Sequence, residues 1–151
     1  PVGFVRRMAK TRKMAQNVLL CRKTAKWGMD MEKSRSYRAA EAMVRSMGVT
    51  CANLSMRQFV CALDLIHREP DMIHAITTRL HPALAELFPD SSVKSIERNL
   101  RSARDTIIKR GDPERLKEVA GYVLQVSPSV GDMLDVLDYY MQCNGLWPED
   151  E

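Results

Sequence analysis

Apolar residues recur three or four positions apart along almost the whole chain, which is the spacing of a helix with one buried face. No segment shows the strict alternation of apolar and polar residues that marks a half-buried strand. Most glycines and prolines lie between the periodic segments, where they end one helix or begin the next. The pattern therefore predicts an all-α fold. The expected helices span residues 4–27, 37–47, 56–68, 71–79, 82–88, 93–107, 113–125 and 130–142.

The length of 151 residues suits one compact domain with an arm better than it suits two domains. We expect a basic helical arm and linker at 1–36, a compact multi-helix domain at 37–144 and an acidic tail at 145–151. No run approaches the roughly 18 apolar residues that cross a bilayer, and no signal-peptide pattern occurs, so no membrane partner is expected. The four cysteines form no CxxC pair and are expected to be reduced, which predicts a cytoplasmic location.

Positive charge is concentrated in two places. Residues 1–36 hold ten Lys and Arg against two acids, a net charge of +8, whereas residues 37–151 hold 13 against 17, a net charge of −4. Within that acidic remainder, residues 91–111 hold six Lys and Arg against two acids, a net charge of +4. Two basic islands on a mildly acidic body predict localised contacts with anions.

The second island lies on one face of the helix expected at 93–107. At about 100° per residue, five apolar residues fall on one side and form its expected core stripe. These are Val93, Ile96, Leu100, Ala103 and Ile107. The opposite side carries Lys94, Arg98, Arg101 and Asp105, with Ser95 and Ser102 beside them and Glu97 and Arg104 at the other edge.

A short helix at 82–88 and a tight turn at Pro89-Asp90 precede this helix, which is the order of a helix-turn-helix. The second helix of that motif lies in the major groove, where Arg can bond guanine through two hydrogen bonds. Backbone N–H groups near Ser91 and Ser92 could hold a phosphate. An ordinary solvated face remains the alternative, because basic outward faces are common on helices.

Several motifs, in order and at almost constant spacing, carry a family resemblance. Residues 48–87 align without gaps, and Met47-Gly48-Val49 stands where the family has Ile-Gly-Val. Residues 96–101 (IERNLR) stand where it has Val-Glu-Arg-Ala-Ile-Arg, and Arg110-Gly111-Asp112 where it has Arg-Gly-Asn. Gly121-Tyr122 and Pro128 also fit. Residues 37–142 thus resemble the DNA-binding effector domain of the stage-zero sporulation response regulator.

The resemblance implies an all-helical domain with a central helix-turn-helix, sequence-specific binding to promoter boxes and control of transcription. The helix at 91–109 would read the major groove. The implied DNA contacts, together with those expected from the helix face, are Ser91, Ser92, Lys94, Ser95, Glu97, Arg98, Arg101 and Arg104. The last helix would pair neighbouring domains, which puts Leu137, Tyr140 and Met141 near a partner. The expected partners are double-stranded DNA, a second copy on tandem or adjacent sites, and RNA polymerase.

Departures from the family leave a second interpretation open. Leu54-Ser55 replaces its Lys-Gly, the turn at Pro89-Asp90 is one residue longer, and Lys94-Ser95 stands where the family has Ser and Arg. The receiver domain is absent from this chain and the basic segment 4–27 stands in its place. Either the receiver has been cut away or the chain is a stand-alone relative with another input. The alternative function is a helical protein-interaction module that no longer binds DNA specifically.

Other patterns point to no chemistry. His67, His74 and His81 recur every seven residues, but Pro70 and Pro82 interrupt any single helix that would carry them, so no metal is expected. The sequence has no GxSxG, no phosphate-binding glycine loop and no Cys with an identifiable base, so we expect neither an enzyme nor a cofactor. The basic arm has three interpretations: a solvated segment, a source of further phosphate contacts, or, less favoured, a membrane-surface helix.

Overall fold

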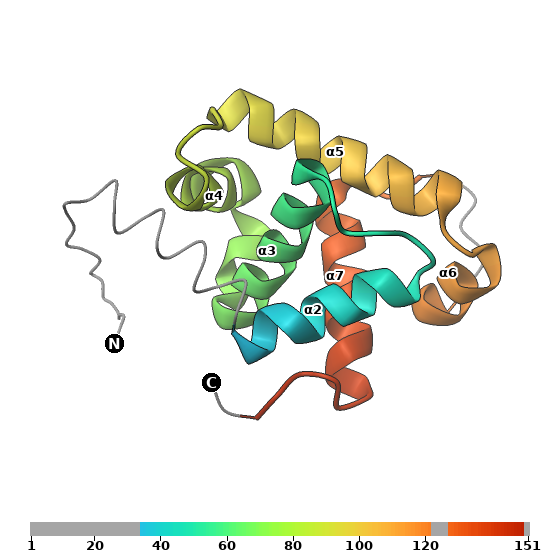
Figure 1. Ribbon diagram of the computed structural model, residues 1–151. Coiled ribbons are helices and arrows are strands. Elements are labelled where there is room, and N and C mark those ends of the chain that lie inside the picture. Colours follow the sequence, from blue (N-terminus) through green and yellow to red (C-terminus); the bar gives the residue numbers. More distant parts are fainter. Residues whose placement is uncertain (1–33, 122–126, 150–151) are drawn as a thin grey trace.

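A computed structural model describes residues 34–121 and 127–149, and within these residues every regular element is a helix. The expected all-α class is confirmed (Figure 1). The helix expected at 4–27 lies outside the described residues. The α-helices are α2 (Arg35–Ser46), α3 (Leu54–Arg68), α4 (His81–Leu87), α5 (Val93–Arg110), α6 (Pro113–Ala120) and α7 (Val130–Cys143).

Short polar side chains determine where most of these helices begin. Ser34 Oγ accepts the Tyr37 N–H (3.1 Å) and Asn53 Oδ1 accepts the Met56 N–H (2.9 Å), so α2 and α3 each start two residues earlier than their apolar spacing predicted. Ser129 Oγ accepts the Asp132 N–H (3.1 Å) and caps α7, which begins at Val130 as predicted. Capping satisfies backbone donors that a helix leaves unpaired in its first turn.

The α-helix expected at 71–79 is not formed. In its place lie a 3₁₀ turn at Pro70–His74 (η1) and a π turn at Ile76–Leu80 (η2), which continues into α4. Pro82 explains the wide turn, because its ring would collide with the carbonyl four residues earlier and it lacks an N–H. In the π turn the Leu80 N–H donates to Ala75 O (3.2 Å) and the His81 N–H donates to Ile76 O.

Two glycines bring the α2–α3 link against the α5–α6 link. Gly48 has φ +96°, and a Cβ added there would lie 3.2 Å from the Asp112 backbone N. A Cβ at Gly111 would lie 2.9 Å from Met47 O, which accepts the Asp112 N–H at 2.8 Å. Helix α6 then stops at Ala120, earlier than the expected residue 125, because Gly121 takes the left-handed conformation (φ +82°).

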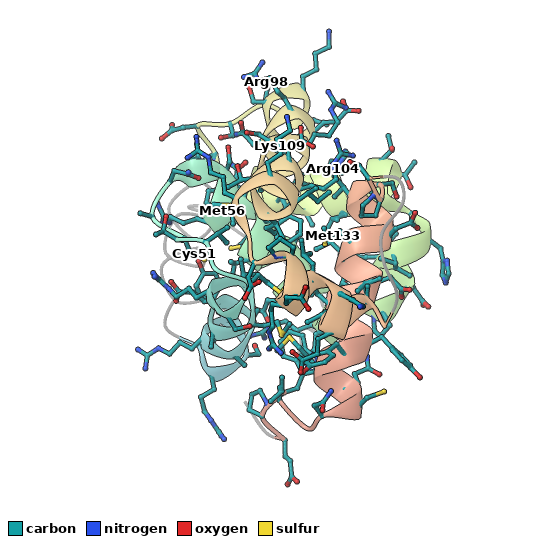
Figure 2. The ribbon with its side chains drawn as sticks, turned by 90° about the vertical axis from the view of Figure 1, so that its right-hand side faces the viewer. Cys51, Met56, Arg98, Arg104, Lys109 and Met133 are labelled. Atoms are coloured by element: carbon teal, nitrogen blue, oxygen red, sulfur yellow. The ribbon has the colours of Figure 1, made fainter. Side chains whose placement is uncertain are left out.

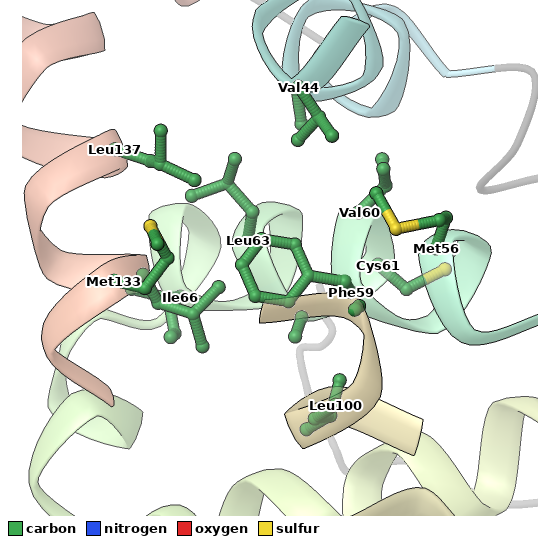
Figure 3. Close-up of a cluster of buried hydrophobic side chains, with 14 of the residues drawn as sticks. Val44, Met56, Phe59, Val60, Cys61, Leu63, Ile66, Leu100, Met133 and Leu137 are labelled. Carbon is green, nitrogen blue, oxygen red and sulfur yellow. The ribbon is translucent and has the colours of Figure 1, made fainter. Parts of the chain in front are cut away.

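Helix α3 forms the centre of the core and packs against α2, α5 and α7. Figure 3 shows the Phe59 ring among apolar side chains that come from all four of these helices. Four of the five residues of the expected α5 stripe are fully buried. Val93 is the exception at 42% exposed, because it begins α5 and the core beneath this helix starts only at Ile96, one turn later.

Candidate nucleic-acid interface

Helices α4 and α5 and the turn between them form the expected helix-turn-helix. Leu84 and Leu87 of α4 are buried, and the Phe88 N–H donates to Leu84 O (2.9 Å) at the end of that helix. The Ser91 N–H then donates to Phe88 O (2.9 Å), which closes the turn. Ser92 caps α5 by accepting the Ser95 N–H at 3.1 Å. In Figure 1, α5 lies along one edge of the domain.

The outer face of α5 carries Lys94, Arg98 and Arg101, all exposed as the helical spacing predicted. Figure 2 shows α5 nearly end-on, with Arg98 projecting away from the domain. Arg101 Nη1 bonds Glu97 Oε2 at 3.2 Å, and both side chains are about half exposed. Exposed ion pairs contribute little free energy, so the Arg101 guanidinium can exchange Glu97 for another anion at small cost.

The serines at the start of α5 make internal hydrogen bonds as well as facing solvent. Ser91 Oγ accepts Gln58 Nε2 (3.1 Å), and Ser92 Oγ donates to Ser95 Oγ (3.1 Å). The backbone N–H groups of Val93 and Lys94 bond no acceptor in the part of the chain that the structure describes. These two amides are donors open to a phosphate.

Arg104 lies apart from the other cations of α5. Its side chain is 19% exposed, and its Nε and Nη2 bond Asp105 Oδ1 at 3.1 and 3.0 Å. Figure 2 shows it on the side of α5 that is turned toward α7, away from Arg98. Arg104 therefore lies apart from Lys94 and Arg98, and together with Glu97 and Arg101 it lines a groove beside α7.

A buried glutamine that the sequence analysis did not identify holds the motif in position. Gln58 of α3 is fully buried, its Nε2 donates to Ser91 Oγ (3.1 Å), and its Oε1 accepts Asn99 Nδ2 (3.0 Å). One amide thus joins α3 to both the turn and α5. The available signal was a polar residue at the apolar spacing of α3, four positions after Leu54 and seven before Leu65.

Helix α7 does not present the residues that were expected near a partner. Leu137 and Met141 are fully buried in the core, so they cannot contact a second copy across the surface. Tyr140 is half-buried, and its hydroxyl accepts Arg115 Nη1 at 3.1 Å. The apolar side chain that α7 exposes is Tyr139, at 68%. Pairing through α7 stays a prediction, for which the outer side of the helix offers Tyr139.

The three histidines lie in separate surroundings. His67 stacks on Trp147 (centroids 3.9 Å apart), and Trp147 Nε1 donates to Asp138 Oδ1 at 2.9 Å. His81 is buried beside α5, and burial lowers its pKa. No group of three His, Cys, Asp or Glu suited to a metal occurs among the described residues. None of the described helices is both long and apolar enough to span a membrane.

The thiols differ in accessibility. Cys51 and Cys61 are buried and Cys143 is exposed. Burial raises the pKa of Cys51 to about 11, so this thiol stays protonated near neutral pH. Cys21 lies outside the described residues.

Similarity to a known protein family covers most of the described domain. The family described as sporulation initiation factor Spo0A C terminal matches residues 40–139. This range includes α3 to α6 completely and most of α2 and α7. No curated protein matches the chain.

Proposed function

The chain belongs to the family of the sporulation initiation factor Spo0A C-terminal domain, and from this premise we propose that it is a sequence-specific regulator of transcription that reads the major groove with α5. The family is one of DNA-binding regulatory domains rather than of enzymes. The observation that carries the proposal is the outer face of α5, with exposed Lys94, Arg98 and Arg101 on the second helix of a helix-turn-helix.

Each group on this face has a distinct role in the proposal. Arg98 and Arg101 bond base edges, and Glu97 releases Arg101 while accepting from a cytosine amino group. Lys94 and the first-turn amides hold phosphates and so orient α5 in the groove. Ser91, Ser92 and Ser95 act mainly by shaping the turn. Arg104, because it faces α7, contributes to the positive potential more than to direct contact.

The partners proposed are double-stranded DNA, a second copy on an adjacent site and RNA polymerase, with the cytoplasm as the place of action. Pairing of two copies would use Tyr139 and the outer side of α7 in place of Leu137 and Met141. The competing function is a helical interaction module that has lost specific DNA binding.

Selection from a randomised duplex library, followed by titration, separates the two functions. The whole chain should enrich a short box and bind it more tightly than a scrambled duplex, with affinity that falls as salt rises. Replacing Arg98→Ala and Arg101→Ala together should lower the affinity for the box by about 1–3 kcal/mol for each base that is no longer bound.

Arg45→Ala is the matched control. Arg45 of α2 pairs with Glu41 four residues earlier (3.0 Å), and its side chain is 52% exposed, as is that of Arg101. Removing it takes away an equivalent surface ion pair on another helix, so the selected box should still bind normally. Failure to enrich any box, or equal losses in Arg45→Ala and the double variant, would favour the interaction module.

A further inference from the structure

A groove of about 590 Å³ lies between the η1–η2 segment, α5 and the first turn of α7. Its volume is within the range of small-molecule sites, about 300–1,000 Å³. Ile73, Ile76 and Val130 give it apolar surface, and Thr77 and His81 add polar groups. The groove lies beside the proposed DNA-reading face and shares Glu97 and Arg101 with it, whereas Lys94 and Arg98 do not line the groove.

Opposite walls of this groove carry opposite charges. Helix α5 contributes Arg101, Arg104 and Glu97, a net charge of +1, and α7 contributes Asp132 and Asp135, a net charge of −2. Within the described residues no ion pair joins the two walls, since the arginines pair with Glu97 and Asp105 on their own helix. A net positive wall and a net negative wall therefore face a common space without neutralising each other across it.

His81, a mostly buried residue, adds a polar ring to the groove. The His81 side chain is on a residue only 6% exposed, and its ring nitrogens bond nothing within the described ranges 34–121 and 127–149. Burial lowers its pKa, so the ring is neutral near pH 7 and offers one donor and one acceptor. The ring nitrogens are not among the fully enclosed polar atoms of the described residues, so they reach the solvent of the groove and can bond a ligand there.

The start of α7 adds backbone donors to the same space. Val130 and Gly131 open this 14-residue helix and line the groove, and their N–H groups have no acceptor within the helix. A Cβ at Gly131 would lie 2.7 Å from Ile76 Cδ1, so glycine is what lets α7 approach η2 this closely. The donors thus lie on the same wall as the two aspartates.

We propose that this groove binds a zwitterionic, dipeptide-sized molecule with apolar side chains. Its carboxylate meets the arginines of α5, its ammonium meets Asp132 and Asp135, and its side chains cover the isoleucines. His81 bonds a polar group in the middle of the ligand. The aspartates would repel a simple anion and the arginines would repel a simple cation, so the two-walled arrangement favours a molecule with both charges.

Occupancy of the groove affects DNA reading through Arg101, which lines the groove and also lies on the outer face of α5. A carboxylate bound to Arg101 competes with DNA for the same guanidinium, so the ligand weakens DNA binding. This coupling rests on the proposed function, whereas ligand binding itself does not.

Calorimetric titration of the whole chain without DNA tests the site. The probes are Leu-Leu, its N-acetyl derivative, which lacks the ammonium, and its C-terminal amide, which lacks the carboxylate. Leu-Leu should bind at least about tenfold more tightly than either blocked form, a difference of about 1.4 kcal/mol. The double variant Asp132→Asn, Asp135→Asn should weaken the binding of Leu-Leu by at least the same factor. It should leave the binding of the N-acetyl derivative unaffected.

Asp71→Asn serves as the control, because Asp71 is an exposed carboxylate of η1 that does not line the groove. Circular dichroism and thermal melting establish that each variant is folded. Equal binding of all three probes, no binding of Leu-Leu at millimolar concentration, or an equal loss in Asp71→Asn would each overturn the proposal. In a second arm, Leu-Leu should raise the Kd for the selected duplex; if it binds without doing so, the coupling alone is wrong.

Discussion

Cys51 shows how burial alone changes the chemistry of one residue. Its thiol is almost completely enclosed beside the end of α2, and desolvation is the largest cause of its raised pKa. Arg45 nearby lowers the pKa and Glu41 raises it, but both effects are smaller than that of burial. The neutral thiol behaves as a small apolar side chain of the core.

Replacing Cys51→Ala should therefore reduce the loss of stability at high pH. The folded-state pKa is raised, so the stability that Cys51 contributes is complete below pH 9.0 and is lost as pH rises toward about 11. The loss is up to about 1.4 kcal/mol per pH unit in that window. Urea unfolding at pH 7 and at several pH values above 9 measures the free energy of unfolding. An equal change of this free energy with pH in the variant and the parent would contradict this account.

Among the helices, α3 determines the position of α5, the helix proposed to read DNA. Gln58 reaches the turn through Ser91 and α5 through Asn99, with both hydrogen bonds close to 3 Å. On the other side of the domain, the Asp112 N–H to Met47 O bond holds the two glycine-containing links together. This backbone hydrogen bond joins two of the motifs that carry the family resemblance. The Gln58–Asn99 bond does not, because Asn99 stands where the family has Ala.

Gln58→Met should destabilise the domain because it leaves Asn99 and Ser91 without their partner. The expected cost is about 1–3 kcal/mol, the usual penalty for an unsatisfied buried polar group. Asn99→Ala should also destabilise the domain. The double variant should lose less free energy of unfolding than the two single variants added together, since no polar group of the pair then remains. Denaturant unfolding of the four proteins gives the coupling free energy, and strict additivity would show that the bridge contributes nothing.

The order of elements was largely predictable from local sequence signals. Ser129, Gly111 and Pro82 mark boundaries by mechanisms that act within a few residues, and the structure has them where the sequence placed them. The segment after Pro70 was predicted wrongly, because 3₁₀, α and π turns share nearly the same apolar spacing over five residues. Only the packing against α4 and the clash at Pro82 decided between them.

For the whole molecule, the distribution of charge matters more than its total. The net charge of +4 combines +8 over residues 1–36 with −4 over the remainder. Association with DNA would then depend on the arm as well as on α5, because each neutralised phosphate releases counterions. The arm lies outside the described residues, so its part in binding stays a prediction.

Deleting residues 1–30 should flatten the dependence of DNA affinity on salt. Each phosphate that the arm no longer neutralises lowers the slope of log K against log salt by about 0.9. A matched chain of full length, with the Lys and Arg of residues 1–30 replaced by Gln, separates the effect of charge from that of length. Both changes should flatten the slope by a similar amount, and an unchanged slope in either would exclude phosphate binding by the arm.

The helical class, the helix-turn-helix and the exposed cations of α5 could all be predicted from the sequence, because periodicity, capping and turn chemistry are properties of neighbouring residues. Tertiary structure decided the rest. Leu137 and Met141 looked suitable for a partner but fill the core, and Arg104 belongs to α5 but faces α7. The Gln58 bridge and the two-walled groove join residues more than 25 positions apart in the chain. Which side chains meet across such distances depends on how whole helices pack, and no local pattern encodes that packing.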